Sequence, residues 1–312
     1  YALYHGLRAK YPTLLSQMLV IAFREATATV KSWNSNHPKR KWELSAKRRS
    51  RSLTMDARLM SLRGNLLTLS TANNQKRWRT LVELPTWFSD RYPQRTLQAT
   101  IVRPDDDELV LTFVFAVPTP ELRSAGKVVG IDRGIKKAIA TSEGGEITNA
   151  TTRAVRRRYA HNRRTLQTKG TRSAKRRLKA MAGREARFVS DFNHRASKVL
   201  ASDVSVSVYV LEDLTSINAK KRKGKTNKKM RTWLSNWSFG QFEFYLRYKC
   251  SAVGIAVASV SPTYTSQQCN ACGKIDRRNR KGARFDCVVC CHSADADHNA
   301  AKNIRDRYNP II

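Results

Sequence analysis

The chain has 312 residues, 41% of them hydrophobic, so it can form one large domain or two to three smaller ones with a real core. Its 59 Lys and Arg against 24 Asp and Glu give a formal net charge of +35, which indicates a polyanionic partner, most simply nucleic acid bound through its phosphates. No segment approaches the roughly 20 apolar residues of a membrane span, and no signal peptide is visible. A generic basic protein, such as a ribosomal one, is the alternative that the charge leaves open.

The first 120 residues predict a helical segment followed by a β-rich one. Apolar residues recur at helical spacing over residues 13–33. Residues 97–103 and 108–117 are typical of two strands joined by an acidic turn. The chain begins with Tyr1 and not with Met, so we expect it to start inside a longer protein that carries a further N-terminal element.

The character of the sequence changes at residue 128, where short buried strands begin. Residues 128–132 (VVGID) predict a strand that ends on an acid. Residues 137–142 and 145–149 can pair beside it as a meander, with two glycines at the turn. Residues 204–212 (VSVSVYVLE) predict another strand that also ends on an acid.

A long basic region separates these strands. Between residues 153 and 187 there are 14 Lys or Arg and one acid, Glu185, and few breakers interrupt the run, so we expect two helices divided near Gly170. Residues 220–231 hold eight basic residues and predict a mobile loop. The remaining expected elements are a helix over 238–252, a strand over 254–260 and a short helix over 297–307.

Five of the six cysteines crowd into residues 269–291, which favours metal binding in a reducing cytosol over a disulfide framework. Two C-x2-C pairs are separated by 14 residues, and each pair can form a tight turn that presents two thiolates to one tetrahedral zinc ion. Four thiolates make a closed, structural site. The predicted ligands are Cys269, Cys272, Cys287 and Cys290.

Two alternatives to this ligand set stay open at this point. Two disulfides are the first, and replacement of one cysteine by His292 is the second. Cys291 is expected to point away from the ion, and Cys250 to be an ordinary core cysteine. The basic residues between the two turns suit contact with nucleic acid, and a solvated loop is the alternative; they are Lys274, Arg277, Arg278, Arg280, Lys281 and Arg284.

Three acids lie where strands end or a helix begins. Asp132 ends the strand VVGID, Glu212 ends VYVLE, and Asp297 begins the last helix. Carboxylates that converge there repel one another, and Mg²⁺, which prefers oxygen ligands, relieves that repulsion. Two such ions can activate a water and stabilise the leaving oxygen of a phosphodiester. Each acid alone could be a turn, surface or helix-dipole residue, and the neighbours Asp213 and Asp295 could share or take these roles.

Several segments together resemble the TnpB family of transposon-encoded RNA-guided nucleases, which is related to the type V CRISPR effectors. The similarity runs in order over about 127–308, and shorter matches lie at 3–17, 55–65 and 229–250. The segments that carry it are GIDRG (130–134), LEDL (211–214), YTSQQCNACG (264–273) and DADHNAAKNI (295–304).

The resemblance implies an α/β fold with an RNase H-like (RuvC) nuclease core, interrupted by a zinc ribbon and preceded by a helical recognition segment and a β-barrel-like (WED) segment. It implies that Asp132, Glu212 and Asp297 are the catalytic acids and hold Mg²⁺, and that the four cysteines hold structural zinc. The implied activity is Mg²⁺-dependent, RNA-guided DNA cleavage by a two-metal mechanism, with guide RNA and target DNA as partners, in the prokaryotic cytoplasm at the nucleoid. The basic helices and the loop 220–231 would line the channel of the heteroduplex, where contacts read backbone shape and base pairing reads sequence.

The expected boundaries follow from the resemblance. They are a helical recognition segment over 1–52, a WED-like segment over 53–126, RuvC-like parts I and II over 127–262 with basic helices over 151–200, the zinc ribbon over 263–294 and RuvC-like part III over 295–312.

Two departures from the family pattern bear on this interpretation. Cys291 stands where the family usually has Gly, which supplies a left-handed turn without strain, and the family's initial strand and helix do not precede Tyr1. A non-cleaving or decayed guided nucleic-acid-binding protein is therefore the alternative function. An unguided resolvase-like nuclease is a further one, although a bare nuclease core does not need the first 120 residues.

Overall fold

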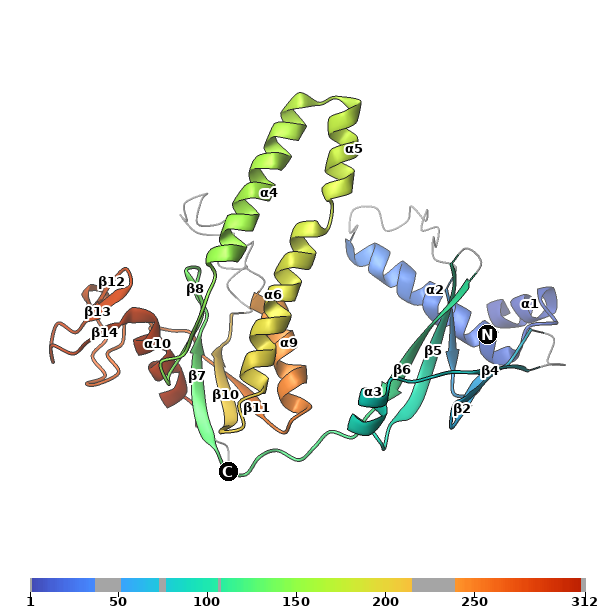
Figure 1. Ribbon diagram of the computed structural model, residues 1–312, viewed down its shortest axis with the longest axis horizontal. Coiled ribbons are helices and arrows are strands. Elements are labelled where there is room, and N and C mark those ends of the chain that lie inside the picture. Colours follow the sequence, from blue (N-terminus) through green and yellow to red (C-terminus); the bar gives the residue numbers. More distant parts are fainter. Residues whose placement is uncertain (1, 37–51, 73–76, 106–107, 215–238, 310–312) are drawn as a thin grey trace. The chain divides into compact units, whose positions relative to one another are not determined.

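The structure is a computed structural model that describes residues 2–36, 52–72, 77–105, 108–214 and 239–309 (Figure 1). The chain divides into two compact units, residues 1–118 and 119–312. The basic loop predicted at 220–231 lies outside the described residues. Among the helices that are described, none combines the length and the apolar character needed to cross a membrane.

The first unit combines helices with two small antiparallel sheets, ordered β1-β5-β6 and β2-β3-β4. Met18 and Ile21 of α2 pack into a core shared with Met55, Leu67 and Leu69 of the strands. The elements are α1 (Ala2–Lys10), α2 (Ser16–Asn36), β1 (Leu53–Asp56), β2 (Met60–Arg63), β3 (Leu66–Leu69), β4 (Trp78–Leu81), α3 (Thr86–Arg91), β5 (Thr96–Asp105) and β6 (Glu108–Ala116). The predicted helix over 13–33 and the two strands around the acidic turn are thus confirmed as α2, β5 and β6.

The second unit is built on a five-stranded sheet of order β11-β10-β7-β8-β9. The strands β11, β10 and β7 are parallel, and β8 and β9 continue from β7 as an antiparallel meander. The bounds are β7 (Lys127–Asp132), β8 (Lys137–Thr141), β9 (Glu146–Thr148), β10 (Val206–Glu212) and β11 (Ala256–Val260). Every strand that the sequence predicted in this half is therefore present.

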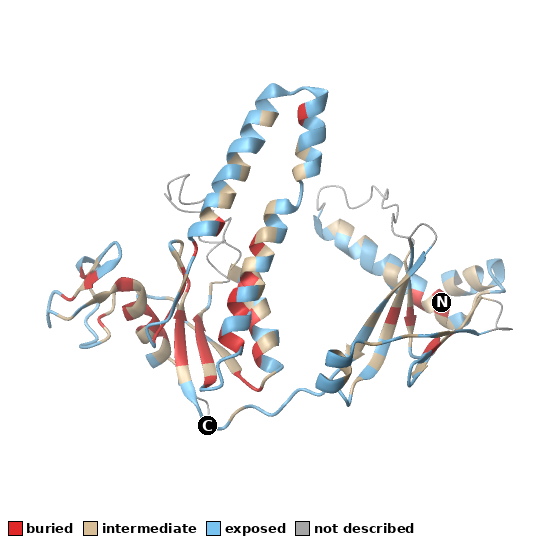
Figure 2. Cartoon of the chain, viewed as in Figure 1, coloured by how far each residue is buried: buried red, intermediate tan, exposed pale blue. Residues whose placement is uncertain are grey.

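Helices cover both faces of this sheet (Figure 1). Helices α6 (Arg184–Ala201) and α9 (Phe239–Ser251) bury Leu200 and Leu246 against Val129 and Ile131 of β7. Helix α10 (Ala296–Asp306) packs against β7. Figure 2 shows the buried residues of this unit gathered in the sheet and on the helix sides that face it.

Gly130 explains how α10 can lie so close to β7. A Cβ atom at this position would stand 2.0 Å from the carbonyl oxygen of Ala301 and 2.6 Å from the backbone nitrogen of Arg305, both in α10. Because successive side chains of a strand point to opposite faces, Asp132 lies on the same face as Gly130. The direct approach of α10 therefore brings this helix to the face on which Asp132 sits.

The basic region forms three helices, α4 (Ala150–Lys169), α5 (Arg172–Met181) and α6, where the sequence predicted two. The expected break at Gly170 is confirmed, with the glycine in the left-handed region at φ +64°. A second break comes at Gly183, also left-handed at φ +75°. Glycine adopts this conformation without strain, so the short interruption Ala182–Gly183 suffices to end α5 and start α6.

Candidate functional site

Four cysteines of the segment 263–294 meet at one point. The ligand atoms of Cys269, Cys272, Cys287 and Cys290 all lie within 4.8 Å of one another, and His292 is not part of this group. The sulfurs of Cys269 and Cys290 are 3.7 Å apart, and those of Cys272 and Cys287 are 3.6 Å apart. These distances are far longer than the S–S bond of a disulfide, about 2.05 Å. The sulfurs are therefore grouped as separate thiols.

The spacing of the sulfurs fits one tetrahedral zinc ion. A zinc–sulfur bond of about 2.3 Å requires neighbouring sulfurs at about 3.8 Å, close to both measured distances. Backbone N–H groups of Cys290 and Val289 lower the pKa of Cys287 to about 6, whereas burial raises the pKa of Cys269, and a bound cation would favour the thiolate form of every ligand. The group could therefore hold zinc as four thiolates.

The rest of the segment holds the two cysteine turns together. Asn279 is fully buried, its amide nitrogen donates to the carbonyl oxygens of Gln267 (3.0 Å) and Lys274 (3.2 Å), and its amide oxygen accepts from the N–H of Val288 (3.0 Å). This one side chain thus ties the first turn to the second. The strands β12 (Arg280–Lys281), β13 (Arg284–Asp286) and β14 (Ser293–Asp295) form a small antiparallel sheet beside them.

Cys291 lies in the left-handed region at φ +56°, where only one other described non-glycine residue, Tyr264, has a positive φ. A side chain in this region is strained by roughly 1 kcal/mol relative to glycine. We expect Cys291→Gly to raise the unfolding free energy of the second unit by about 1 kcal/mol and to leave the metal content of the purified protein unchanged. Denaturant titration measures the first quantity and mass spectrometry of the metal the second. A loss of stability, or a loss of metal, would contradict this account of Cys291.

The acids predicted at the strand ends lie side by side on one face of the sheet. In the parallel pair β7–β10, Gly130 is aligned with Val210 and Ile131 with Leu211, so Asp132 and Glu212 come next along the two strands. The residues Ile131 and Leu211 face the core under α6 and α9, so alternation turns both acids to the face of α10. Asp297 stands in the first turn of that helix.

The charges of the three acids influence one another. The pKa of Asp132 is raised to about 7 by burial first, and then by the negative charges of Glu212 and Asp297. Burial also raises the pKa of Glu212, although a hydrogen bond from the Thr265 hydroxyl and nearby arginines oppose the shift. Among the described residues, these carboxylates do not gather within 4.8 Å as the cysteines do.

A positive charge from the cysteine segment enters the acid cluster. The Arg280 guanidinium of β12 forms an ion pair with Asp297 at 2.6 Å, and its charge lowers the pKa values of both Asp132 and Glu212. Of the six basic residues predicted to form a nucleic-acid surface, Arg278 and Arg284 also pair with acids of the segment itself. Arg280 differs from these two because it pairs with Asp297, one of the three acids predicted to be catalytic.

A second arginine fixes the ends of the two acid-bearing strands. Arg133 follows Asp132 directly, and only 1% of its side chain is exposed. Its guanidinium donates to the backbone carbonyl of Glu212 and, at 3.0 Å, to the carboxylate of Glu243 in α9, and it lies over the ring of Phe239. Arg133 therefore links the ends of β7 and β10 to the helix behind them.

Asparagines of α10 anchor the cysteine segment. Asn299 donates to the carbonyl of Gln268 at 2.8 Å and accepts from the N–H of Asn270 at 3.1 Å. Asn303, one turn later, donates to the carbonyl of Thr265 at 2.8 Å. These contacts hold the segment on the helix that carries Asp297, so Arg280 and Asp297 are brought together by a fixed frame.

The neighbouring acids have other tasks. Asp295 caps α10 by accepting from the N–H groups of Asp297 (3.0 Å) and His298 (3.2 Å), and it forms an ion pair with Lys137 at 3.0 Å. Asp213 is exposed, one residue beyond the end of β10.

Cys250 is fully buried in the core of the sheet, as predicted. The sequence analysis named Arg280 only as one of six basic residues, and it did not single out Arg133 or the two asparagines. The spacing of Asn299 and Asn303, one turn apart on the last helix, was the signal that could have found the anchor.

Parts of the chain are similar to a described family and to several named proteins. A family model described as "Cas12f1-like, TNB domain" matches residues 239–304. A CRISPR-associated endodeoxyribonuclease Cas12f1 of Sulfoacidibacillus thermotolerans is 31% identical over 208 residues, which cover 60% of this chain and 47% of the relative. A TnpB-like protein of Methanocaldococcus jannaschii is 34% identical over 130 residues, which cover 41% of this chain and 45% of the relative. A putative RNA-guided DNA endonuclease InsQ of Escherichia coli is 29% identical over 206 residues, which cover 60% of this chain and 50% of the relative.

The fold is also similar to a solved structure. A Cas12f1 determined in complex with sgRNA and target DNA superposes with a TM-score of 0.54 at 16% identity, over 83% of this chain and 59% of the other. This likeness confirms the mixed α/β class. The chain spans about half the length of the curated relatives that it matches.

Proposed function

Because this chain belongs to the family of TnpB and Cas12f1 proteins, we propose that it is an RNA-guided, Mg²⁺-dependent DNA endonuclease of the TnpB type. The observation that carries the proposal is the electrostatic coupling of Asp132, Glu212 and Asp297 on one face of the sheet. Burial and mutual repulsion leave Asp132 with a pKa of about 7, which is the environment that a divalent cation relieves. We further propose that the sheet with its helices is an RNase H-like (RuvC) core and that the segment 263–294 is its inserted zinc ribbon.

The donor set fits Mg²⁺ by its chemistry, since it offers three carboxylates at a partly buried edge. Asp132, Glu212 and Asp297 would hold the ions, which when bound would activate a water and stabilise the leaving oxygen of the phosphodiester. Arg133 positions the first two acids by tying their strand ends together. Arg280 brings a guanidinium to the same edge, where it can bind a phosphate oxygen of the DNA strand in place of Asp297.

The remaining parts supply binding. The basic helices α4 to α6 carry 14 Lys or Arg against one acid between residues 153 and 187, so we propose that they contact the guide and target strands through phosphates. We propose that residues 1–52 serve as the helical recognition segment, 53–126 as the WED-like segment, 127–262 as RuvC-like parts I and II, and 295–312 as part III.

Purification with co-expressed RNA tests this function. The protein is isolated from cells that transcribe the surrounding locus, its RNA is sequenced, and a duplex that matches the RNA is added with Mg²⁺. We expect enrichment of one RNA and cleavage of the matching duplex, with no cleavage in EDTA. Absence of a specific RNA would refute guidance, and a specific RNA without cleavage would favour a guided binding protein.

Protons and Mg²⁺ compete for the carboxylate of Asp132, so the affinity for Mg²⁺ should depend on pH. Since its pKa is about 7, the carboxyl holds a proton below this pH and must lose it to ligate a cation, so we expect Mg²⁺ affinity to fall by up to tenfold for each unit of pH below about 7. Arg280→Gln removes a charge that lowers this pKa, and should move the midpoint to higher pH. Calorimetric titration of Mg²⁺ between pH 5.5 and 8.5, spanning roughly this transition, measures both. A pH-independent affinity, or the same midpoint in the variant, would show that Asp132 does not control binding.

A further inference from the structure

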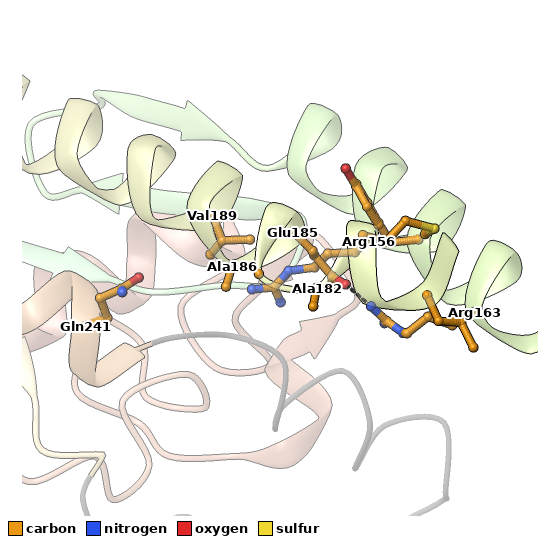
Figure 3. A pocket seen from close by; sticks show the side chains of 11 residues that line it. Arg156, Arg163, Ala182, Glu185, Ala186, Val189 and Gln241 are labelled. Carbon is orange, nitrogen blue, oxygen red and sulfur yellow. Dashed lines mark hydrogen bonds and ion pairs between the residues drawn. The ribbon is translucent and has the colours of Figure 1, made fainter. Parts of the chain in front are cut away.

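Helices α4, α5, α6 and α9 enclose a pocket that lies apart from the acids and the cysteines (Figure 3). Its volume is about 520 Å³, within the roughly 300–1,000 Å³ typical of sites for small ligands. Leu178 and Met181 of α5 and Val189 of α6 give it an apolar lining, and Tyr159 of α4 adds an aromatic ring. A flat apolar group of modest size is the shape that such a lining accepts.

Two arginines and one acid meet in this pocket. Glu185, the single acid in the basic region, pairs with Arg163 at 2.5 Å, and Arg156 lies on the other side of the carboxylate in Figure 3. Burial lowers the pKa of Arg156, and the negative charge of Glu185 opposes this shift. The pocket therefore holds two guanidinium groups against one carboxylate, which leaves it with a net positive charge.

A polar group stands at the opposite end. The amide oxygen of Gln241 in α9 accepts from Asn193 at 2.9 Å, which orients the side chain. Its amide nitrogen has no acceptor among the residues that the structure describes, so it can donate to a ligand. The pocket thus combines an apolar floor, an aromatic ring, a cation and an amide donor.

We propose that this pocket binds a single unpaired nucleotide of a bound strand, with the base against Tyr159 and the apolar lining and the phosphate at Arg156. Nucleobases match the flat apolar space, stack on aromatic and guanidinium groups, and carry acceptors for an amide N–H. A paired base cannot enter, because its faces are covered and its edge is engaged in the duplex. The same chemistry could come from RNA or from a DNA strand. The inference rests on the nucleic-acid binding part of the proposed function and not on cleavage.

A substitution that fills the pocket tests this. Ala186 lines the opening and is exposed, so Ala186→Phe occupies the space without changing charge; Ala154, exposed on α4 and outside the pocket, gives the matched control Ala154→Phe. Fluorescence anisotropy with protein freed of RNA compares a short single strand, as RNA and as DNA, with the duplex of the same sequence. We expect Ala186→Phe to weaken single-strand binding on the order of tenfold and to leave duplex binding unchanged, and Ala154→Phe to change neither.

This experiment distinguishes an RNA strand from a DNA strand as the source of the nucleotide, and it can also overturn the proposal. A loss confined to RNA assigns the nucleotide to an RNA strand, and a loss confined to DNA assigns it to a DNA strand. Equal loss for single strand and duplex, or no loss at all, overturns the proposal, and a lowered melting temperature without loss of binding shows that the pocket is filled by the protein's own residues. Arg164 lies outside the pocket, so Arg164→Gln is the matched control for Arg156→Gln. We expect Arg156→Gln to weaken single-strand binding more than Arg164→Gln does, and the two variants to weaken duplex binding equally. Equal losses of single-strand binding would overturn the role of Arg156. None of these readouts requires a guide or cleavage.

Discussion

Asp132→Asn is expected to abolish DNA cleavage while leaving RNA binding intact. The variant keeps the shape of the side chain but removes the negative charge that would hold a cation at the ends of β7 and β10. Loss of such a ligand removes several kcal/mol of transition-state stabilisation, on the order of a thousandfold in rate. Cleavage of a matched duplex under single-turnover conditions measures the rate, and sequencing of the co-purified RNA checks that the guide is retained.

The same variant has a second readout that does not depend on activity. The pKa of Asp132 is raised from 3.8 to about 7 in the folded protein, so the folded state binds the proton more tightly than the unfolded state. Without divalent ions, the contribution of Asp132 to stability is therefore greatest at low pH and is lost as the pH rises from about 4 to about 7, by on the order of a few kcal/mol. The difference in unfolding free energy between the wild type and Asp132→Asn should change with pH by this amount.

A matched control separates the site from general effects of charge. Asp191 lies on α6, exposed and paired with Arg195 one turn away, so Asp191→Asn removes an acid whose ion pair contributes little. It should cleave as the wild type does. If Asp132→Asn still cuts the duplex, or if Asp191→Asn loses activity to the same extent, the acid cluster is not the cutting centre.

The acids could be predicted because their positions follow from local patterns. Short apolar strands that end on Asp132 and Glu212 are visible in the sequence, and parallel pairing then places the two residues at one edge. The cysteine group was equally predictable, since its spacing alone brings four sulfurs together. The extra break at Gly183 was missed because a single glycine in a basic run does not by itself distinguish a bend from a helix end.

The arginines at the site could not be predicted from local patterns. Arg280 is one of six basic residues between the cysteine pairs, and only the docking of the segment onto Asn299 and Asn303 selects it to meet Asp297. Arg133 follows a strand like many surface residues, yet it is buried because α9 covers it. The pocket between the helices likewise forms only when α9 packs against the consecutive helices α4, α5 and α6. In each case the contact forms only when segments pack together in the folded protein, so the local sequence does not reveal it.

Removal of zinc is expected to unfold residues 269–290 and to leave the five-stranded sheet folded. The segment has a small core of Cys269, Phe285, Cys287 and Ala296, which contributes only a few kcal/mol against the cost of ordering its backbone. Binding of zinc by four thiolates contributes on the order of 10 kcal/mol at neutral pH, so the fold of the segment depends on the ion. Cys287→Ser should have the effect of chelation, because it removes one of the four sulfurs that would hold the ion.

Trypsin reports this unfolding directly, because it cleaves after Lys and Arg and the segment carries six of them between its turns. We expect rapid cleavage there in the chelated protein and in Cys287→Ser, with one zinc per chain lost. Cys291→Ser is the matched control, since Cys291 adjoins the group without belonging to it, and it should keep both zinc and protection. Resistance to trypsin after complete removal of zinc would show that the segment folds without the metal. If the segment does unfold, Arg280 loses its ion pair with Asp297, because the contacts that anchor the segment on α10 are lost. DNA cleavage should then fall even though Asp132 and Glu212 are unchanged.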